Sequence, residues 1–323
     1  MSNSKSSAVG YMPEAGEAVL KLNDGNNMPM VSSDFFFTTV PGLSYPQLGY
    51  GLGTVLHKRS RDQKNEAIVT TTKLAIEHGF RHLDGAELYN NEKELGDAVR
   101  ASPIPRSDLF IVTKLCGTEK RDVKAEFEGS LSRLGLDYVD LYLVHAPYMA
   151  DNAKDLQHVW SQMEEIKISG RAKSIGVSNF LQEHIEIILE TAEIPPAVNS
   201  IEYHPYLQRG SLINFLKSQN IAISAYSTLT ALTEEAPGPV NELYTQLACK
   251  YDVSETDIAL RWCLDQNIAA ITTTRKRERL KALCENLPTF KLTTREIDSI
   301  SVAGQSKHYR KFLTDRFPPE DQR

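Results

Sequence analysis

The chain has 323 residues, of which 41% are hydrophobic and 24% are charged, and its formal net charge is −6. The length exceeds that of one small domain but suits a barrel with insertions, and the composition is that of a globular protein with a large core. The negative charge disfavours a nucleic-acid partner, and no apolar run approaches the ~18 residues that a membrane-spanning helix needs.

The N-terminal segment over residues 1–18 is small and polar, so we expect it to be flexible. It lacks the apolar core of a secretory signal, which favours a protein of the cytosol. Residues 19–22 then lead into Asn23-Asp24-Gly25-Asn26, a turn sequence that predicts a β-hairpin. The four cysteines are irregularly spaced and form no Cys-x-x-Cys pair, so we expect reduced thiols rather than a zinc ribbon or a redox motif.

From residue 48 onward, short apolar runs alternate with helical patterns. The expected strands are 48–52, 80–83, 109–113, 138–144, 174–177, 197–202, 222–226 and 269–272. The expected helices are 64–78, 91–100, 123–134, 156–169, 182–192, 212–218, 241–251, 255–265 and 277–285. Strands that alternate with helices imply an α/β fold with a parallel sheet. No linker divides the chain, so we expect one domain over 19–323, with an aromatic-containing C-terminal tail over 305–323 that docks on it.

Four titratable residues, Asp84, Tyr89, Lys114 and His145, follow or end three successive predicted strands. Taken singly, each suits an ordinary role in a turn, in packing or in solvent. In a closed parallel barrel, however, the C-terminal strand ends converge on one rim. There Asp84 could hold the Lys114 ammonium, and this charge would lower the pKa of the Tyr89 phenol. His145 could orient a substrate oxygen, and Tyr89 could then protonate that oxygen. This chemistry suits reduction of a carbonyl group by hydride from a nicotinamide cofactor.

Several motifs surround these residues. They are Gly51-Leu52-Gly53-Thr54, Asp84 with Tyr89-Asn90-Asn91-Glu92, Val112-Thr113-Lys114-Leu115, residues 137–145, residues 175–180, and Glu202-Tyr203-His204-Pro205-Tyr206. In these motifs, and from about residue 20 to its C-terminus, the chain resembles the aldo-keto reductase superfamily. The resemblance implies an eight-stranded (β/α)8 TIM barrel, a monomer, NADPH-dependent reduction of a ketone or aldehyde, and a catalytic tetrad of Asp84, Tyr89, Lys114 and His145. Residues 272–274 and 307–312 look closest to fungal members that reduce conjugated polyketones and α-keto amides.

The resemblance also implies a cofactor site. Residues that match Ser178 and Asn179 bond the nicotinamide amide in the family, and the one that matches Tyr226 stacks on the ring. After the eighth predicted strand, hydroxyls and arginines suit the 2′-phosphate of NADPH, although a solvated basic helix start is the alternative. The expected cofactor contacts are Gly53, Thr54, Ser178, Asn179, Ser200, Tyr226, Ser227, Leu229, Thr272, Thr273, Thr274, Arg275 and Arg279.

The chain departs from the family pattern at several of these positions. Ser200 replaces a glutamine that contacts the nicotinamide amide, which predicts a cofactor contact weaker by about 1 kcal/mol. Thr272 and Thr273 replace a Pro-Lys pair, so the usual lysine to the 2′-phosphate is missing. The small residues Val55 and Ala146 predict a wide pocket for a bulky or secondary-metabolite carbonyl. Candidate pocket walls are Tyr50, Leu88, Cys116, Tyr148, Tyr206, Tyr309 and Phe312.

Two other functions fit parts of the pattern. His82, Asp84, His145 and His204 lie near strand ends, and imidazole with carboxylate suits zinc in a barrel hydrolase. Paired His-x-His and His-Glu-x-x-His motifs are absent, so we expect no metal. A non-catalytic, nucleotide-sensing barrel is the other alternative, and the complete tetrad argues against it. The sequence therefore predicts a cytoplasmic NADPH-dependent carbonyl reductase that acts on a small molecule and has no nucleic-acid or membrane partner.

Overall fold

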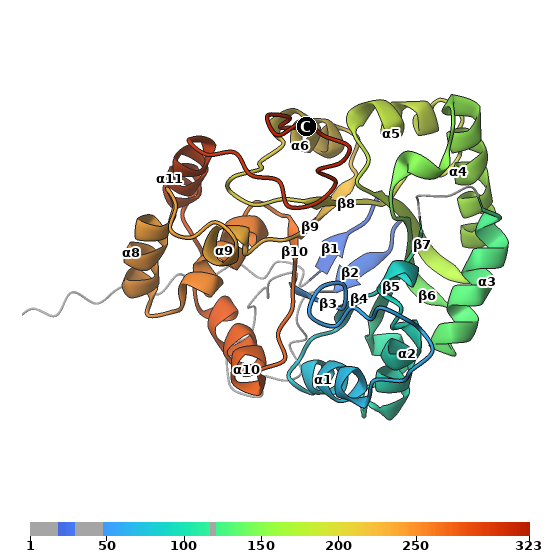
Figure 1. The fold of residues 1–323 in the computed structure, drawn as a ribbon, viewed down its shortest axis with the longest axis horizontal. Coiled ribbons are helices and arrows are strands. Elements are labelled where there is room, and N and C mark those ends of the chain that lie inside the picture. The colour runs from blue at the N-terminus through green and yellow to red at the C-terminus, as the bar shows by residue number, and fades with distance from the viewer. Residues whose placement is uncertain (1–18, 30–47, 117–120) are drawn as a thin grey trace, which may run out of the picture.

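The computed structural model describes residues 19–29, 48–116 and 121–323, which form a closed barrel of parallel strands (Figure 1). The strand order is β10-β3-β4-β5-β6-β7-β8-β9, with β10 pairing with β3 to close the circle. This arrangement confirms the expected (β/α)8 TIM barrel. The segment over 1–18, which we expected to be flexible, lies outside the described residues.

The barrel strands are short and almost entirely buried, because helices cover the outer face and side chains fill the interior. They are β3 (Leu48–Gly51), β4 (His82–Asp84), β5 (Phe110–Leu115), β6 (Val139–Val144), β7 (Ala172–Ser178), β8 (Val198–Glu202), β9 (Ala222–Tyr226) and β10 (Ala269–Thr272). The second barrel strand includes Asp84, one residue later than expected. Its ladder continues because Leu52 donates its backbone N–H to the Asp84 carbonyl oxygen at 3.0 Å.

Helices surround the barrel (Figure 1). They are α1 (Glu66–Glu77), α2 (Glu92–Ala101), α3 (Val123–Leu134), α4 (Ala153–Ile168), α5 (Gln182–Leu189), α6 (Gly210–Ser218), α7 (Thr230–Thr233), α8 (Asn241–Tyr251), α9 (Glu255–Leu264), α10 (Arg277–Asn286) and α11 (Thr294–Gln305). Side-chain caps set several of the starts. Asn152 accepts the N–H of Asp155 at 3.1 Å, so α4 begins three residues before the expected position. Gly135 ends α3 in the left-handed region, as its sequence position indicated.

The helix α11 was absent from the sequence-based expectation. It begins with a capping box, in which Thr293 caps the N–H of Glu296 and the Glu296 carboxylate accepts the N–H of Thr293. This Thr-x-x-Glu pattern is a signal that could have identified the helix. No helix in the described part of the chain is long and apolar enough to cross a membrane.

The predicted hairpin is present as β1 (Val19–Lys21) and β2 (Asn27–Pro29). Leu22, next to the turn, packs in a small apolar cluster with barrel residues such as Phe110, Leu141 and Val198. Asn23 donates to the carbonyl oxygen of Pro196 at 2.8 Å. The hairpin therefore closes the end of the barrel from which β5 and β8 start.

The opposite rim is partly covered by the C-terminal tail, residues 306–323 (red in Figure 1). Tyr309 donates its backbone N–H to the carbonyl oxygen of Tyr206 at 3.1 Å. The backbone N–H groups of Lys311 and Phe312 donate to the buried carboxylate of Glu202, at 2.8 and 3.0 Å. These bonds confirm that the tail docks on the barrel.

Candidate active site

The four predicted catalytic residues meet on one rim of the barrel. Asp84 is the last residue of β4, Lys114 lies near the end of β5, and His145 follows β6 directly. Tyr89 ends a short 3-10 helix, η2 (Glu87–Tyr89), in the connection after β4. Parallel pairing of β4 with β5 and of β5 with β6 brings these chain segments side by side.

Lys114 is the centre of the group. Its Nζ donates to Oδ1 of Asp84 at 2.7 Å and to the carbonyl oxygen of Gly85 at 2.7 Å. The same Nζ lies 3.4 Å from the Tyr89 hydroxyl oxygen. The ring of His145 packs edge-on against the ring of Tyr89, with centroids 5.6 Å apart. The arrangement thus joins a carboxylate, an ammonium, a phenol and an imidazole.

Burial dominates the electrostatics of this group. It lowers the pKa of Lys114, and the Asp84 carboxylate opposes that change. It also lowers the pKa of His145 to about 3, with help from the Lys114 charge. His145 is therefore neutral at physiological pH and has one N–H to donate.

The expected direction of the Tyr89 pKa shift is wrong in this structure. Burial raises the pKa of Tyr89 well above its ordinary value, and the Asp84 charge adds to the rise. The Lys114 ammonium, whose Nζ lies 2.7 Å from Asp84, does not reverse this rise in the pKa of Tyr89. Tyr89 consequently holds its proton firmly at neutral pH.

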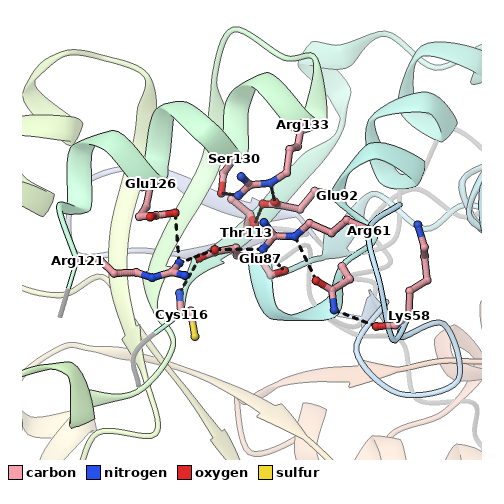
Figure 2. Close-up of polar contacts among 11 residues, drawn as sticks. Lys58, Arg61, Glu87, Glu92, Thr113, Cys116, Arg121, Glu126, Ser130 and Arg133 are labelled. Carbon is pink, nitrogen blue, oxygen red and sulfur yellow. Dashed lines mark hydrogen bonds and ion pairs between the residues drawn. The ribbon is translucent and has the colours of Figure 1, made fainter. Parts of the chain in front are cut away.

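An ion cluster around the buried carboxylate of Glu87 holds the turn that carries Tyr89. Figure 2 shows Arg61 and Arg121 approaching the Glu87 carboxylate from opposite sides, at 3.1 and 2.6 Å. The backbone N–H of Cys116, two residues after Lys114, donates to the same carboxylate at 3.2 Å. Glu87 was not among the residues predicted from the sequence to have a role. Its position two residues before Tyr89 was the available signal.

On the predicted nicotinamide side, the expected residues lie together and bond to one another. Asn179, in the left-handed region at φ 62°, donates to the carbonyl oxygen of His145 at 2.9 Å. Tyr226 donates its hydroxyl proton to Oδ1 of Asn179 at 2.6 Å. Ser178 donates to the carbonyl oxygen of Ser200 at 2.9 Å. These groups adjoin the tetrad, and their hydroxyls and amide suit a carboxamide.

On the predicted phosphate side, Thr272 ends β10, Thr273 to Lys276 lead into α10, and Arg279 lies in the first turn of that helix. Tyr50 is fully buried and donates to the carbonyl oxygen of Thr274 at 3.0 Å, which anchors this segment to β3. The hydroxyl of Thr273 is buried without a partner among the described residues. Arg275 and Arg279 are exposed and form no ion pair within the described part of the chain. An unpartnered hydroxyl and free guanidinium groups at a helix start fit a phosphate group.

The remaining expected cofactor residues lie on the same rim. Gly53 touches the tetrad, because a Cβ atom there would lie 2.5 Å from the Tyr89 ring. Thr54 next to it is exposed. Ser227, at φ 59°, and Leu229 form the connection from β9 to α7. All of these follow the C-terminal ends of strands.

The candidate pocket walls separate into three groups by exposure. Tyr50 and Tyr206 are buried in the core, so these two predictions of wall residues are wrong. Leu88 and Phe312 are large apolar residues that remain exposed, at 49% and 37%. Cys116, Tyr148 and Tyr309 are half-buried.

The zinc-hydrolase alternative lacks support. Among the described residues, no three His, Cys, Asp or Glu side chains are grouped as a metal ion needs. His82 packs edge-on against Phe110 with ring centroids 5.3 Å apart, while His204 lies 3.2 Å from the carboxylate of Glu202. The four cysteines are free thiols.

Comparison with known proteins agrees with this site. A model of the aldo/keto reductase family matches residues 47–304. The chain is 39% identical over 275 residues to an NAD/NADP-dependent indole-3-acetaldehyde reductase of Schizosaccharomyces pombe, covering 84% of this chain and 96% of that protein. It is 35% identical over 286 residues to an NADPH-dependent alpha-keto amide reductase of Saccharomyces cerevisiae, covering 83% and 90%.

A solved structure shares the fold as well. The crystal structure of an aldo/keto reductase from Brucella melitensis superposes with a TM-score of 0.74 at 31% identity, covering 88% of this chain and 98% of that one. The match to the family model covers most of the chain, including every residue of the tetrad. The chain therefore belongs to the aldo/keto reductase family and is an oxidoreductase that reduces carbonyl groups with NADPH.

Proposed function

We propose that Tyr89 is the proton donor of this reductase and that Lys114, Asp84 and His145 support it. The observation that carries the proposal is the position of the Lys114 Nζ, 2.7 Å from Asp84 and 3.4 Å from the Tyr89 hydroxyl. A charged lysine at this distance stabilises the phenolate that remains after proton transfer. Asp84 keeps that lysine charged in a buried site.

The steps follow from the chemistry of these side chains. NADPH, when bound, supplies the hydride for the carbonyl carbon. Tyr89 and the neutral His145 hydrogen-bond the carbonyl oxygen, on which negative charge develops. An alkoxide is a far stronger base than a phenolate, so the proton moves from Tyr89 to the substrate oxygen although the pKa of Tyr89 is raised.

We propose that the rim residues hold the cofactor as the family resemblance implies. Ser178 and Asn179 would bind the carboxamide, and Tyr226 would pack on the ring. Arg275 and Arg279, with the Thr273 hydroxyl, would bind the 2′-phosphate. The free arginines and the unpartnered hydroxyl support this assignment.

The substrate that best suits the rim is a bulky carbonyl compound with an apolar body. Among the described residues, the apolar side chains of Val55, Leu88 and Phe312 stay exposed in segments next to this rim, and Ala146 after the catalytic histidine is small. Isolated exposed apolar residues are ordinary, but three around one site favour an apolar ligand. The two fungal relatives are named for carbonyl substrates, indole-3-acetaldehyde and alpha-keto amides, and these names support a bulky carbonyl substrate here.

The test is Tyr89→Phe, which removes one hydroxyl and keeps the ring. We expect kcat for reduction to fall about 10²- to 10⁴-fold, while the Kd for NADPH stays near the wild-type value. A panel of small aldehydes and bulky ketones would test the substrate class. Unchanged turnover in Tyr89→Phe would contradict the assignment, and strict preference for small aldehydes would contradict the wide pocket.

We further propose a cytoplasmic monomer built as one domain over 19–323. The closed barrel that β3 to β10 form supports the single domain, and family resemblance favours the monomer. Light scattering of the purified chain tests the oligomeric state, and cell fractionation tests the location. A single cooperative unfolding transition is expected for one domain.

A further inference from the structure

The connection between β3 and α1, residues 52–65, holds the turn that carries Tyr89. Lys58 in this connection donates its backbone N–H to the carbonyl oxygen of Tyr89 at 3.1 Å. Asn90, at φ 57°, donates from Nδ2 to the carbonyl oxygen of Lys58 at 3.0 Å. Nε of Arg61 donates to Oδ1 of Asn90 at 3.1 Å. The main chain around the Tyr89 carbonyl is therefore tied to the 52–65 connection.

The position of Gly53 in this connection is fixed by the hydrogen bonds of its neighbour Leu52. The backbone N–H of Leu52 donates to the carbonyl oxygen of Asp84 at 3.0 Å. Its carbonyl oxygen accepts Nδ2 of the fully buried Asn91 at 3.0 Å. The same Nδ2 donates to the carbonyl oxygen of Leu56 at 2.8 Å. The backbone on both sides of Gly53 is therefore held to β4 and to the start of α2.

The backbone of Gly53 lies against the face of the Tyr89 ring. A Cβ atom at Gly53 would lie 2.5 Å from Cζ of Tyr89 and 2.8 and 2.9 Å from its two Cε atoms. The nearly equal distances to the two Cε atoms put that position above the carbon that bears the hydroxyl. Unbonded carbon atoms pack at about 3.5–4.0 Å. A methyl group here would thus have to displace the hydroxyl end of the ring by about 1 Å.

This close approach, rather than the backbone conformation, explains the glycine. Gly53 has no positive φ, so its φ does not require glycine. Several hydrogen bonds hold the 52–65 connection, whereas the ring turns about two side-chain torsions, so an added methyl group would move the ring. The Lys114 Nζ lies 5.0 Å from the ring centre, and the His145 ring lies edge-on at 5.6 Å. Displacement of the ring would change its alignment with both groups.

From these contacts we propose that Gly53 is a positioning residue for the proton donor. Its missing side chain lets the phenol lie against the backbone of the 52–65 connection, and this contact keeps the Tyr89 hydroxyl 3.4 Å from the Lys114 Nζ. The inference rests on the proposed role of Tyr89 as the proton donor. It gives Gly53 a function in proton transfer, in addition to the cofactor contact that the family resemblance implies.

A double-mutant cycle of Gly53→Ala and Tyr89→Phe tests the proposal. The kcat for reduction of 4-nitrobenzaldehyde is measured with NADPH far above its measured Kd, so that cofactor affinity does not enter. We expect Gly53→Ala to lower kcat about 10- to 100-fold, because an error of about 1 Å in a catalytic group is costly. In the Tyr89→Phe background the same alanine is expected to lower kcat less than about threefold, since the hydroxyl that it misplaces is gone.

The outcomes separate this inference from the proposed function. Unchanged kcat in Tyr89→Phe would overturn the role of Tyr89 and this inference with it. If Tyr89→Phe loses turnover but Gly53→Ala keeps the wild-type kcat at saturating NADPH, the positioning role alone is overturned. Equal losses from the alanine in both backgrounds would also overturn it, because Gly53 would then act independently of the hydroxyl.

Gly238→Ala is the matched control. A Cβ atom at Gly238 would collide with the hydroxyl of Tyr206, a buried tyrosine outside the tetrad. Both alanine variants are expected to melt at a lower temperature than the wild type, because overpacking is destabilising, but the control is expected to keep its kcat. A comparable loss of kcat in the control would assign both losses to general destabilisation and overturn the positioning role.

Asn90→Gly tests the same contact without added volume. Glycine accepts the left-handed backbone at φ 57°, and the change removes both side-chain bonds between the Tyr89 turn and the 52–65 connection. We expect kcat to fall about 3- to 10-fold, and we expect this loss to vanish in the Tyr89→Phe background. If Gly53→Ala does not fold, this variant decides the question. A wild-type kcat in Asn90→Gly would overturn the proposal.

Crystal structures of the wild type and of Gly53→Ala give a readout independent of turnover. The Tyr89 hydroxyl is expected to be displaced by about 1 Å relative to the Lys114 Nζ in the variant. A phenol that keeps its wild-type position beside the alanine would overturn the inference, whatever the kcat of the variant.

Discussion

Glu87 accepts the backbone N–H of Cys116 at 3.2 Å, which joins the turn carrying Tyr89 to the end of the strand carrying Lys114. Arg61 and Arg121 complete this link from two further connections on the rim. The 3.4 Å separation of the Lys114 Nζ and the Tyr89 hydroxyl therefore depends on a carboxylate that touches neither atom. Glu87 is a positioning residue on this view.

Glu87→Gln is expected to lower kcat about 10- to 100-fold, because small displacements of catalytic groups are costly. The KM for the substrate is expected to change much less. Burial raises the pKa of Glu87. The hydrogen bonds from Arg121, the Cys116 backbone and Arg61 outweigh burial and hold this pKa below its ordinary value. Steady-state kinetics and thermal melting of the variant provide the measurement.

Asp140→Asn is the control for this change. Asp140 also accepts one backbone N–H, from Ile111 at 2.9 Å, and pairs with Arg106 and Lys173, but it lies near the start of β6. Both variants are expected to lose stability, about 1–3 kcal/mol, and the control is expected to keep its kcat. Loss of kcat in both would assign the effect of Glu87→Gln to general destabilisation.

The raised pKa of Tyr89 predicts different pH profiles for the two directions of the reaction. Reduction needs the protonated phenol, so its kcat/KM is expected to stay flat from about pH 6 to about pH 9. Alcohol oxidation needs the phenolate, so its kcat/KM is expected to rise about tenfold per pH unit over that range. A fall in the reduction profile with a midpoint near neutrality would indicate the lowered pKa that the sequence alone suggested.

Arg279→Met is expected to raise the Kd for NADPH about tenfold, through loss of a charge-assisted contact with phosphate. The Kd for NADH, which has no 2′-phosphate, is expected to stay unchanged. Calorimetric titrations with both nucleotides measure the difference, and Arg295→Met on α11 serves as a surface control. An equal rise in the Kd for NADPH and for NADH would mean that Arg279 does not bind the 2′-phosphate.

His82 predicts a loss of stability in acid. Burial lowers its pKa to about 4 from the ordinary value of 6.5, so the unfolded chain binds a proton first. The neutral ring contributes fully to the free energy of unfolding above pH 6.5, and this contribution is lost as the pH falls toward 4. The loss amounts to about 2 kcal/mol at pH 5. Urea unfolding at pH 7.5 and pH 5 is expected to show a smaller acid loss in His82→Gln. An identical loss in both proteins would mean that other groups cause it.

Much of the fold follows from the sequence because a buried parallel sheet gives clear apolar runs. The strand 138–144 and the helix 123–134 were expected nearly as found, since burial and the Gly135 cap mark them. The strand boundary at Asp84 was missed because a polar residue at a strand end looks like a turn. Its place in the ladder depends on Leu52, which is distant in sequence.

The site was predictable where residues adjoin strand ends, and less so where distant segments meet. Asp84, Lys114 and His145 could be placed on one rim from topology alone. The contact of the tail with Glu202 could not be predicted, because Lys311 lies 109 residues from Glu202 in the chain. The direction of the Tyr89 pKa shift also depends on burial, which no local pattern reports.

The β1–β2 hairpin stabilises the end of the barrel opposite the active-site rim. Asn23 and Asp24 tie it to the body, the latter through Lys167 at 2.8 Å, and none of these three residues belongs to the proposed catalytic group. Substitutions on the active-site rim that aim at new substrates therefore leave the contacts between the β1–β2 hairpin and the barrel unchanged.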